Sequence, residues 1–232
     1  MYRKDNNHEA PRKVTYVSPK VNGFQLGLSY IPDSSNTGSA VDYQLPKAFR
    51  RLKNVVSAIV IYGNKINGFD TALSLGIDKG TYFQTRKAMP HYDLQDYNIG
   101  VMLGKQGVNF AASYGNAGKS LKEKGDYNKY KEYYYSVGVA YNQEKYNVSL
   151  SYLGSKIGKV NRLSGDNYTI LKAYSLGADY QILKGLQVYA EGTAYNVANS
   201  YIQKTILAVF GKSNILPNNK GFVFIMGGKI HF

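Results

Sequence analysis

Residues 133–152, YYYSVGVAYNQEKYNVSLSY, decide the fold of this chain. Aromatic or aliphatic residues stand at every second position from Tyr133 to Tyr141 and again from Tyr146 to Tyr152. The positions between them are mostly Ser, Gly, Ala and Asn. A period of two is typical of a β-strand with one apolar face, and the polar segment 142–145 has the length of a tight turn. The stretch therefore predicts two antiparallel strands joined by a hairpin.

The same alternation recurs along the chain, and no apolar stripe of helical period is long enough to predict a helix. Further strands of this kind are expected around residues 24–30, 174–182 and 186–194. Counted in this way, the chain holds about 11 strands, and its fold class is all-β.

The connections between the expected strands alternate in length. Long polar stretches are expected at 32–53, 79–93, 116–131, 155–171 and 197–219, and short turns lie between them. Several of these turns carry Asn-Gly or Lys-Gly tips, which supply residues with φ > 0. This layout is typical of an antiparallel up-and-down transmembrane β-barrel with short periplasmic turns and long extracellular loops. A soluble β-sandwich, the alternative, does not sort its connections so regularly.

Tyrosines gather on the apolar faces near the expected strand ends, where the two aromatic girdles of a membrane barrel would lie. They are Tyr30, Tyr62, Tyr114, Tyr133, Tyr141, Tyr146, Tyr152, Tyr174 and Tyr180. The opposite faces are mostly Gly, Ser, Asn, Gln and Thr. Alternation alone leaves open which face is outside, but this placement favours a membrane barrel over a soluble one.

Composition narrows the class of protein further. The chain has 232 residues, no Cys and a formal net charge of +14. Its longest near-apolar run, 55–62, is far shorter than a spanning helix, which excludes a helical membrane protein. The absence of Cys excludes a disulfide scaffold, Cys-ligated zinc and a thiol nucleophile. Residues 1–9 lack the apolar segment of a secretory signal, so the chain is expected to be either cytoplasmic or without its front.

The last residues alternate up to a terminal aromatic side chain. Counting back from Phe232 in steps of two gives Ile230, Gly228, Met226 and Phe224. This pattern resembles the sorting signal of bacterial outer-membrane barrels, which the barrel-assembly machinery recognises. It predicts a location in the bacterial outer membrane, with Phe232, Ile230, Met226 and Phe224 as the assembly signal. An amphipathic last strand that happens to end in Phe is the simpler alternative.

Two segments carry a family resemblance. Residues 13–24, KVTYVSPKVNGF, resemble the V-x-Y-x-SP-x-x-x-G-F strand–turn–strand segment of the Gram-negative general porins, the trimeric 16-stranded type. Residues 173–186, AYSLGADYQILKGL, resemble the late hairpin of that family, although its usual Arg-Thr is replaced by Gly-Leu. The resemblance implies a water-filled outer-membrane channel for passive diffusion of small hydrophilic solutes and ions, without enzymatic activity or cofactor. It also implies a homotrimer at full length, in contact with outer-membrane lipid and lipopolysaccharide.

The number of expected strands differs from that of the family. Bacterial single-chain barrels use an even number of strands, and the SP-x-x-x-G-F hairpin of the family begins its sixth strand. We therefore expect residues 1–232 to be the C-terminal part of a porin-type β-barrel domain, with the signal peptide and first strands absent. The sheet is expected to be C-shaped and open, or closed by a strained parallel seam, with residues 1–11 irregular. Asp5 and Glu9 are expected to be a remnant of the constriction loop.

No pattern in the sequence indicates catalysis or metal binding. The three His residues have no carboxylate or His neighbours at ligand or triad spacing. The basic run within 47–53 could bind nucleic acid or anionic lipopolysaccharide, although a solvated loop is the default. The chain lacks a recognition helix or a clustered aromatic platform, so no nucleic-acid partner is expected. Catalytic, cofactor-binding and metal-binding residues are all expected to be absent.

Alternation assigns several charges to the lining of the pore. Lys13, Asp179, Glu191 and Lys229 fall on the small polar face and are the candidate pore-lining charges. Asp179 and Glu191 are close enough in the expected hairpin to approach each other, but a lumen-lining pair explains them better than a hydrolase dyad. The net positive charge predicts weak anion selectivity. The alternative functions are a non-channel barrel that acts as a surface antigen or adhesin, and a non-functional porin fragment.

Overall fold

The computed structural model describes residues 12–34, 50–84, 90–122, 124, 132–161, 165–199 and 218–230. These residues form β1 (Val14–Val17), β2 (Phe24–Asp33), β3 (Arg50–Ile66), β4 (Phe69–Gln84), β5 (Leu94–Lys105), β6 (Val108–Gly118), β7 (Glu132–Asn142), β8 (Tyr146–Asn161), β9 (Gly165–Leu183), β10 (Leu186–Asn199) and β11 (Asn218–Ile230). Nowhere in the described ranges is there a helix long and apolar enough to cross a membrane.

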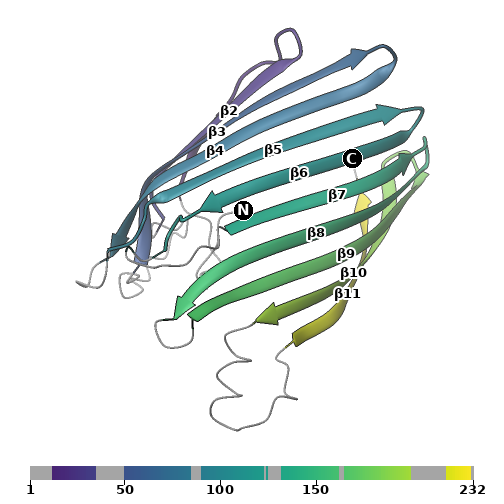
Figure 1. The fold of residues 1–232 in the computed structure, drawn as a ribbon. Coiled ribbons are helices and arrows are strands. Elements are labelled where there is room, and N and C mark those ends of the chain that lie inside the picture. The colour runs from purple at the N-terminus through teal and green to yellow at the C-terminus, as the bar shows by residue number, and fades with distance from the viewer. Residues whose placement is uncertain are drawn as a thin grey trace.

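The strands form a single sheet in which each strand lies beside its neighbours in sequence. The order runs from β1 to β11 without a crossover, as Figure 1 shows for most of the sheet. All the pairs are antiparallel, from Val14↔Tyr30 at one edge to Leu186↔Ile230 at the other. The all-β, up-and-down fold expected from the alternation is confirmed.

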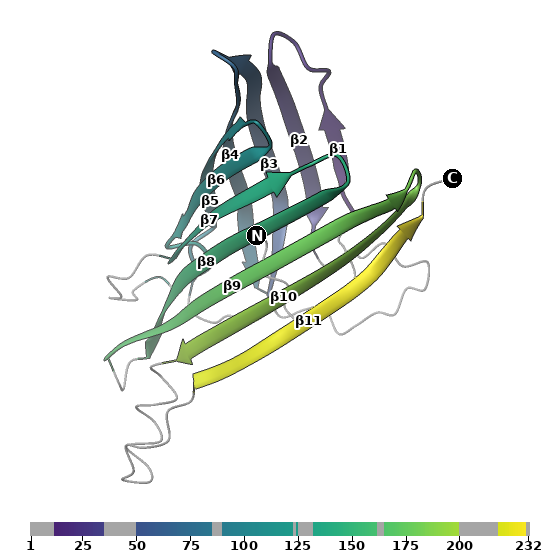
Figure 2. The same ribbon diagram turned by 90° about the vertical axis from the view of Figure 1, so that its right-hand side faces the viewer.

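The sheet is strongly curved and open. Figure 2 shows β1 and β11 at its two ends, facing each other across the concave side without meeting. Among the described residues, β1 pairs with β2 and β11 pairs with β10, and neither makes a second pairing. This confirms the C-shaped sheet and not the parallel seam. Residues 1–11, expected to be irregular, lie outside the described residues.

The short turns follow the chemistry that their sequences predict. At Asn67-Gly68, φ is 50° at the first residue and 80° at the second. Asn22-Gly23 and Gln106-Gly107 also combine two positive φ values. Two such residues in succession form the type I′ geometry, whose twist matches that of the strands on either side. These turns therefore set the register of their hairpins at one end of the sheet.

At the opposite end, which we call the loop end, the strands run further than the sequence predicted. The expected loop 79–93 begins as strand, because β4 continues to Gln84. The expected loop 155–171 is mostly strand, and β8 and β9 stay paired as far as Asn161↔Gly165. A backbone ladder needs no apolar side chains to satisfy its N–H and C=O groups, so pairing continues past the point where apolar alternation stops.

The described part of the sheet has almost no interior core. Leu52 and Val55 are its buried apolar residues. Large apolar side chains are instead exposed on one face, with Leu150 at 53% and Leu176 at 58% exposure. The apolar face of the alternation is therefore the convex, outward one, and the small polar face is the concave, inward one.

Candidate functional site

The outward face carries a band of aliphatic side chains that continues from strand to strand. Val139 on β7 pairs with Leu150 on β8, which in turn pairs with Leu176 on β9. All three are more than 40% exposed. A continuous band of exposed aliphatic side chains over neighbouring strands is favourable in a bilayer and unfavourable in water.

An aromatic belt borders this band toward the loops. We call Tyr114, Tyr133, Tyr135, Tyr152 and Tyr174 the loop-end belt. Ring centroids lie 4.8 Å apart in the Tyr152–Tyr174 pair and 5.8 Å apart in the Tyr135–Tyr152 pair. Tyrosines with an apolar ring and a polar hydroxyl suit the boundary between hydrocarbon and head groups.

A second aromatic belt borders the band toward the turns. Phe24 and Tyr62 lie 4.7 Å apart, and Tyr141 and Tyr146 lie 6.2 Å apart. Tyr146 and Tyr152 stand at opposite ends of the band on β8, about 20 Å apart along the strand at the usual rise per residue. Two belts separated by aliphatic residues are the arrangement expected of a membrane-spanning wall.

Lysines on the outward face lie mainly beyond the loop-end belt. By register, Lys172 pairs with Gly154 and Asn196, one step beyond the belt residue Tyr174. Lys220 pairs with Asn196 on the other side of β10, and the Lys156 Nζ lies 5.0 Å from the Tyr168 ring centroid. We call Lys156, Lys172 and Lys220 the loop-end lysines. Their place fits the head-group region next to hydrocarbon.

The inward face is built mostly from small and hydroxylated side chains, with a few larger apolar ones such as Ile61, Met102 and Leu153. Ser113 and Ser136 share a hydrogen bond of 2.7 Å across β6 and β7, and Ser175 and Thr193 share another of 2.7 Å across β9 and β10. The curved sheet holds a hollow of about 680 Å³ against this face. Short side chains that bond to one another along the wall leave the space in front of it open.

Inward-facing tyrosines lie along the wall, because glycines on neighbouring strands make room for them. The Tyr134 ring lies over Gly115, the Tyr195 ring over Gly221 and the Tyr189 ring over Gly227. A Cβ on Gly227 would come within 2.6 Å of the Tyr189 hydroxyl oxygen, so no larger residue fits without moving the ring. These pairs allow aromatic residues on the inner face without filling the hollow.

The structure places the four candidate pore-lining charges as follows. Asp179 and Glu191 are on the inward face, where Asp179 pairs with Tyr189 and Glu191 pairs with Gly177. Lys229 is on the same face near a turn, opposite Gln187. Lys13 lies one residue before β1, in alternation with Thr15, whose hydroxyl bonds to the inward Ser29 at 3.3 Å.

Asp179 and Glu191 each have hydrogen-bond partners of their own. Asp179 Oδ1 accepts hydrogen bonds from Asn147 Nδ2 at 2.7 Å and Gln187 Nε2 at 2.6 Å. Glu191 Oε1 accepts one from Thr193 Oγ1 at 3.2 Å. Amide and hydroxyl donors of the wall thus bond to each carboxylate separately.

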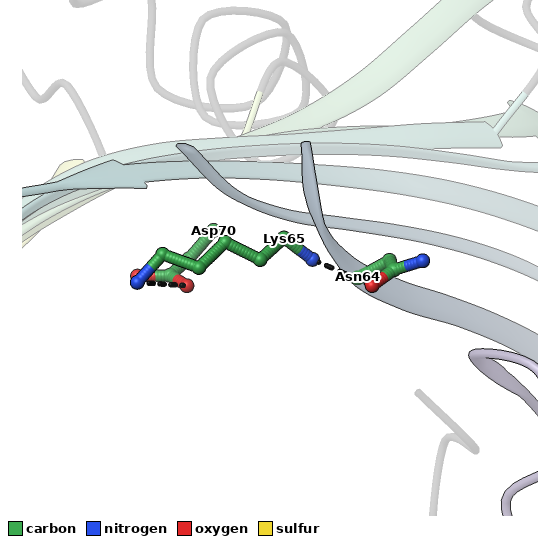
Figure 3. A network of polar contacts seen from close by, with 3 residues as sticks. All are labelled: Asn64, Lys65 and Asp70. Carbon is green, nitrogen blue, oxygen red and sulfur yellow. Dashed lines mark hydrogen bonds and ion pairs between the residues drawn. The ribbon is translucent and has the colours of Figure 1, made fainter. Parts of the chain in front are cut away.

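Sequence reasoning missed three inward-facing carboxylates. Asp70 lies beside a turn, with its Oδ1 4.0 Å from Lys65 Nζ. Figure 3 shows the two side chains together with Asn64, whose Oδ1 accepts a hydrogen bond of 2.8 Å from the backbone N–H of Lys65. Asp78 and Asp96 pair directly across β4 and β5. The sequence did contain a signal for these three carboxylates, because each of them alternates with small residues of the polar face, such as Gly76 and Gly100.

The remaining candidate residues lie at the two ends of the chain. Asp5, Glu9 and Phe232 are outside the described residues. Ile230, Met226 and Phe224 are on the outward face of β11 and are 64%, 74% and 59% exposed. Among the described side chains, no three His, Cys, Asp or Glu gather in a way that could hold a metal ion.

Comparison with known protein families agrees with a membrane-barrel arrangement of the two faces. The sequence pattern of the Gram-negative porins matches residues 3–200. The chain belongs to the Gram-negative porin family. Its relatives include uncharacterized proteins of Rickettsia conorii, 28% identical over 268 aligned positions, and of Rickettsia typhi, 27% identical over 271. Both alignments cover 97% of this porin chain but 57% and 58% of the relatives. The chain therefore spans less than two thirds of the length of these relatives.

Solved structures agree with the fold. The outer-membrane channel DcaP of Acinetobacter baumannii superimposes with a TM-score of 0.53 at 11% identity, over 94% of this porin chain and 61% of that protein. The outer-membrane expressed OmpT of Vibrio cholerae gives a TM-score of 0.53 at 13% identity, over 95% and 64%. At this identity the likeness shows the shared barrel architecture alone.

Proposed function

We propose that this chain is part of an outer-membrane porin that forms a water-filled channel for passive diffusion of small hydrophilic solutes and ions. The observation that carries the proposal is the inverted arrangement of the sheet. Its aliphatic band and two aromatic belts face outward, and its small hydroxylated residues face an open hollow. A wall with this polarity separates hydrocarbon from water.

Closure of such a wall requires partners for both of its edges. An unpaired N–H or C=O group in hydrocarbon costs several kcal/mol, so an open edge is not stable in a bilayer. We propose that residues 1–232 belong to one porin-type barrel domain in which further strands pair with β1 and β11. By themselves, residues 1–232 are then expected to give no stable channels.

The partners proposed for this porin follow from its outward face. We propose that the loop-end lysines contact the phosphates of lipopolysaccharide, in keeping with a location in the bacterial outer membrane. The exposed alternation of Phe224, Met226 and Ile230 fits recognition by the barrel-assembly machinery. A homotrimer is proposed from the resemblance to the trimeric general porins.

A channel accounts for the wall better than the other candidate functions do. A barrel acting only as an antigen or adhesin needs no open inward face, and a filled interior would have required larger apolar side chains on that face. The wall holds its carboxylates by separate amide and hydroxyl donors and gives no catalytic arrangement among the described residues. We therefore propose no enzymatic activity.

Planar-bilayer recording tests the proposal. Two forms are compared: residues 1–232 alone, and the complete in-frame product of the gene that contains them. Stepwise conductance from the complete product supports the channel. If that product folds, as judged by heat-modifiable gel mobility and β-type circular dichroism, but gives no conductance, the channel is contradicted and the antigen or adhesin role is favoured.

A further inference from the structure

Charged side chains are sorted between the two faces of the sheet. Lysines whose register turns them outward are Lys79, Lys105, Lys156, Lys172 and Lys220. On the inward face, the charges in the middle of the described strands are acidic and include Asp78, Asp96, Asp179 and Glu191. Inward Lys65 and Lys229 lie beside turns. The net charge of +14 is therefore not the charge that this part of the wall presents to the hollow.

Asp78 and Asp96 form the most unusual feature of the inward face. They stand directly opposite each other on β4 and β5, and like charges in that position destabilise a sheet. Asp96 is only 7% exposed, and its Oδ1 is buried without a hydrogen-bond partner in the described part of the chain. A carboxylate in such a place calls for a positive counter-charge.

The other described acids of the wall already have partners. Asp179 accepts two amide hydrogen bonds, Glu191 accepts one from a hydroxyl, and Asp70 is paired with Lys65. Their contacts are satisfied by neighbouring side chains. Among the described acids, Asp96 is the one with a buried carboxylate oxygen that accepts no hydrogen bond, and this makes the pair of Asp78 and Asp96 the candidate cation site on this part of the wall.

We propose that the channel prefers cations, with Asp78 and Asp96 as the residues that determine this preference. The inference rests on the proposed channel function. Carboxylate oxygens are the natural ligands of hard cations. Two of them form a weak site from which an ion can leave again, as conduction requires. This proposed preference for cations is opposite to the anion preference predicted from the net charge. The reason is that the outward lysines face lipid and not the pore.

Further polar side chains lie on the same part of the wall as the pair. The Asn98 side chain lies over Gly76, one step along the same ladder, and adds an amide oxygen to this part of the wall. The hydroxyl end of the Tyr134 ring lies over Gly115 on β6, the strand next to β5. Asn98 on β5 and the Tyr134 ring, which reaches over β6 from β7, therefore lie on the same stretch of the wall as the two carboxylates.

Cation binding can be measured without a conducting channel. The complete in-frame product is folded in detergent micelles and titrated with Tb³⁺, whose luminescence is sensitised by nearby tyrosines such as Tyr134. We expect Asp78→Asn and Asp96→Asn each to weaken Tb³⁺ binding at least about threefold, with Ca²⁺ as competitor. The matched control is Asp70→Asn, whose partner is Lys65. Unchanged binding in the double variant Asp78→Asn/Asp96→Asn, with native-like circular dichroism, would overturn the proposal.

Reversal potentials in a KCl gradient test the same residues in the channel. We expect K⁺ to permeate better than Cl⁻, and the double variant to lower the ratio of the two permeabilities at least about twofold. Lys105→Gln, on the outward face at the turn end, should leave the ratio unchanged. A preference for Cl⁻ in the unmodified channel would overturn this inference while leaving the channel itself intact. Absence of any conductance would contradict the proposed function, and the Tb³⁺ titration would still decide whether the pair binds cations.

Discussion

Tyr174 and Ser175 are neighbours in sequence, yet they face two different environments. Tyr174 is 56% exposed on the outward face, where its ring lies 4.8 Å from that of Tyr152. Ser175 faces the hollow and shares its hydrogen bond with Thr193. In a soluble barrel the two would exchange roles, because the apolar face would fill the interior. The comparison shows that the direction of curvature, and not the alternation itself, defines this wall as one that separates lipid from water.

The largest expected effect is the difference in folding stability between two variants that place the same charge on opposite faces of β8, at adjacent residues. Leu150→Lys puts an ammonium group in the middle of the aliphatic band and should destabilise the folded protein in lipid vesicles by about 2–4 kcal/mol. Ser149→Lys puts the same group in the hollow, where water solvates it, and should cost less than about 1 kcal/mol. Urea titration of vesicle-inserted protein, followed by tyrosine fluorescence, measures both. Equal costs would mean that the two faces are not in different solvents.

Cysteine labelling sharpens the comparison at single positions. Cys at Leu28, Val139 or Leu150 should react with lipid-soluble thiol reagents, and Cys at Ser29, Gly138 or Ser149 with water-soluble ones. Because the wild-type chain has no Cys, each variant carries a single thiol. We expect the aqueous reagent to react about tenfold faster with Cys at position 149 than at 150, since the thiolate forms readily only in water. The inverse pattern would indicate a soluble barrel with an apolar core.

A smaller effect should separate aromatic and non-aromatic pairs across β2 and β3. Phe24 and Tyr62 face each other on the outward side, and Gln25 and Ile61 on the inward side. In double-mutant cycles with alanine, the aromatic pair should show a coupling energy of about 0.5–1.5 kcal/mol. The inward pair should fall below it, since it brings together an amide and an alkyl group. A larger coupling for Gln25 and Ile61 would argue that the belts do not stabilise the wall.

The smallest effect is expected at the loop-end lysines. Lys172→Gln should weaken association with vesicles that contain anionic lipid by up to about 1 kcal/mol at low salt and leave association with neutral vesicles unchanged. Salt should abolish the difference, because it screens exposed charges. Lys105→Gln is the matched control, as Lys105 Nζ lies 4.4 Å from the Phe69 ring centroid at the turn end. An equal loss in both variants would remove the case for a phosphate contact at the loop end.

Local patterns predicted much of the fold and of the outward face. Two positive φ values at Asn67-Gly68 follow from residue types alone, as does the aromatic placement of Tyr146 and Tyr152. The limits of the strands at the loop end could not be predicted in this way. Apolar alternation ends near the membrane surface, whereas backbone pairing between β8 and β9 continues to Asn161↔Gly165. The period of the side chains thus reports the membrane-spanning part of a strand and not its full hydrogen-bonded length.

The inward face was predicted less completely. Counting assigned Asp179 and Glu191 to the inward face, but counting could not show that Asn147 and Gln187 donate hydrogen bonds to Asp179. Those contacts join three strands, and their geometry depends on register. The acids at 70, 78 and 96 alternate with small residues in the same way. They were missed because single charges near an expected loop do not stand out until their cross-strand neighbours are known.

By itself, the sequence determined the strands, the tight turns, the two kinds of connection and the residues that share a face, because each depends on neighbours only a few positions away along the chain. The tertiary structure decided which face is convex, that β1 and β11 remain apart, and that Asp78 meets Asp96. These features depend on the curvature of the whole sheet and on the register between strands. No local period encodes either of them, since the same alternation is compatible with a barrel turned inside out.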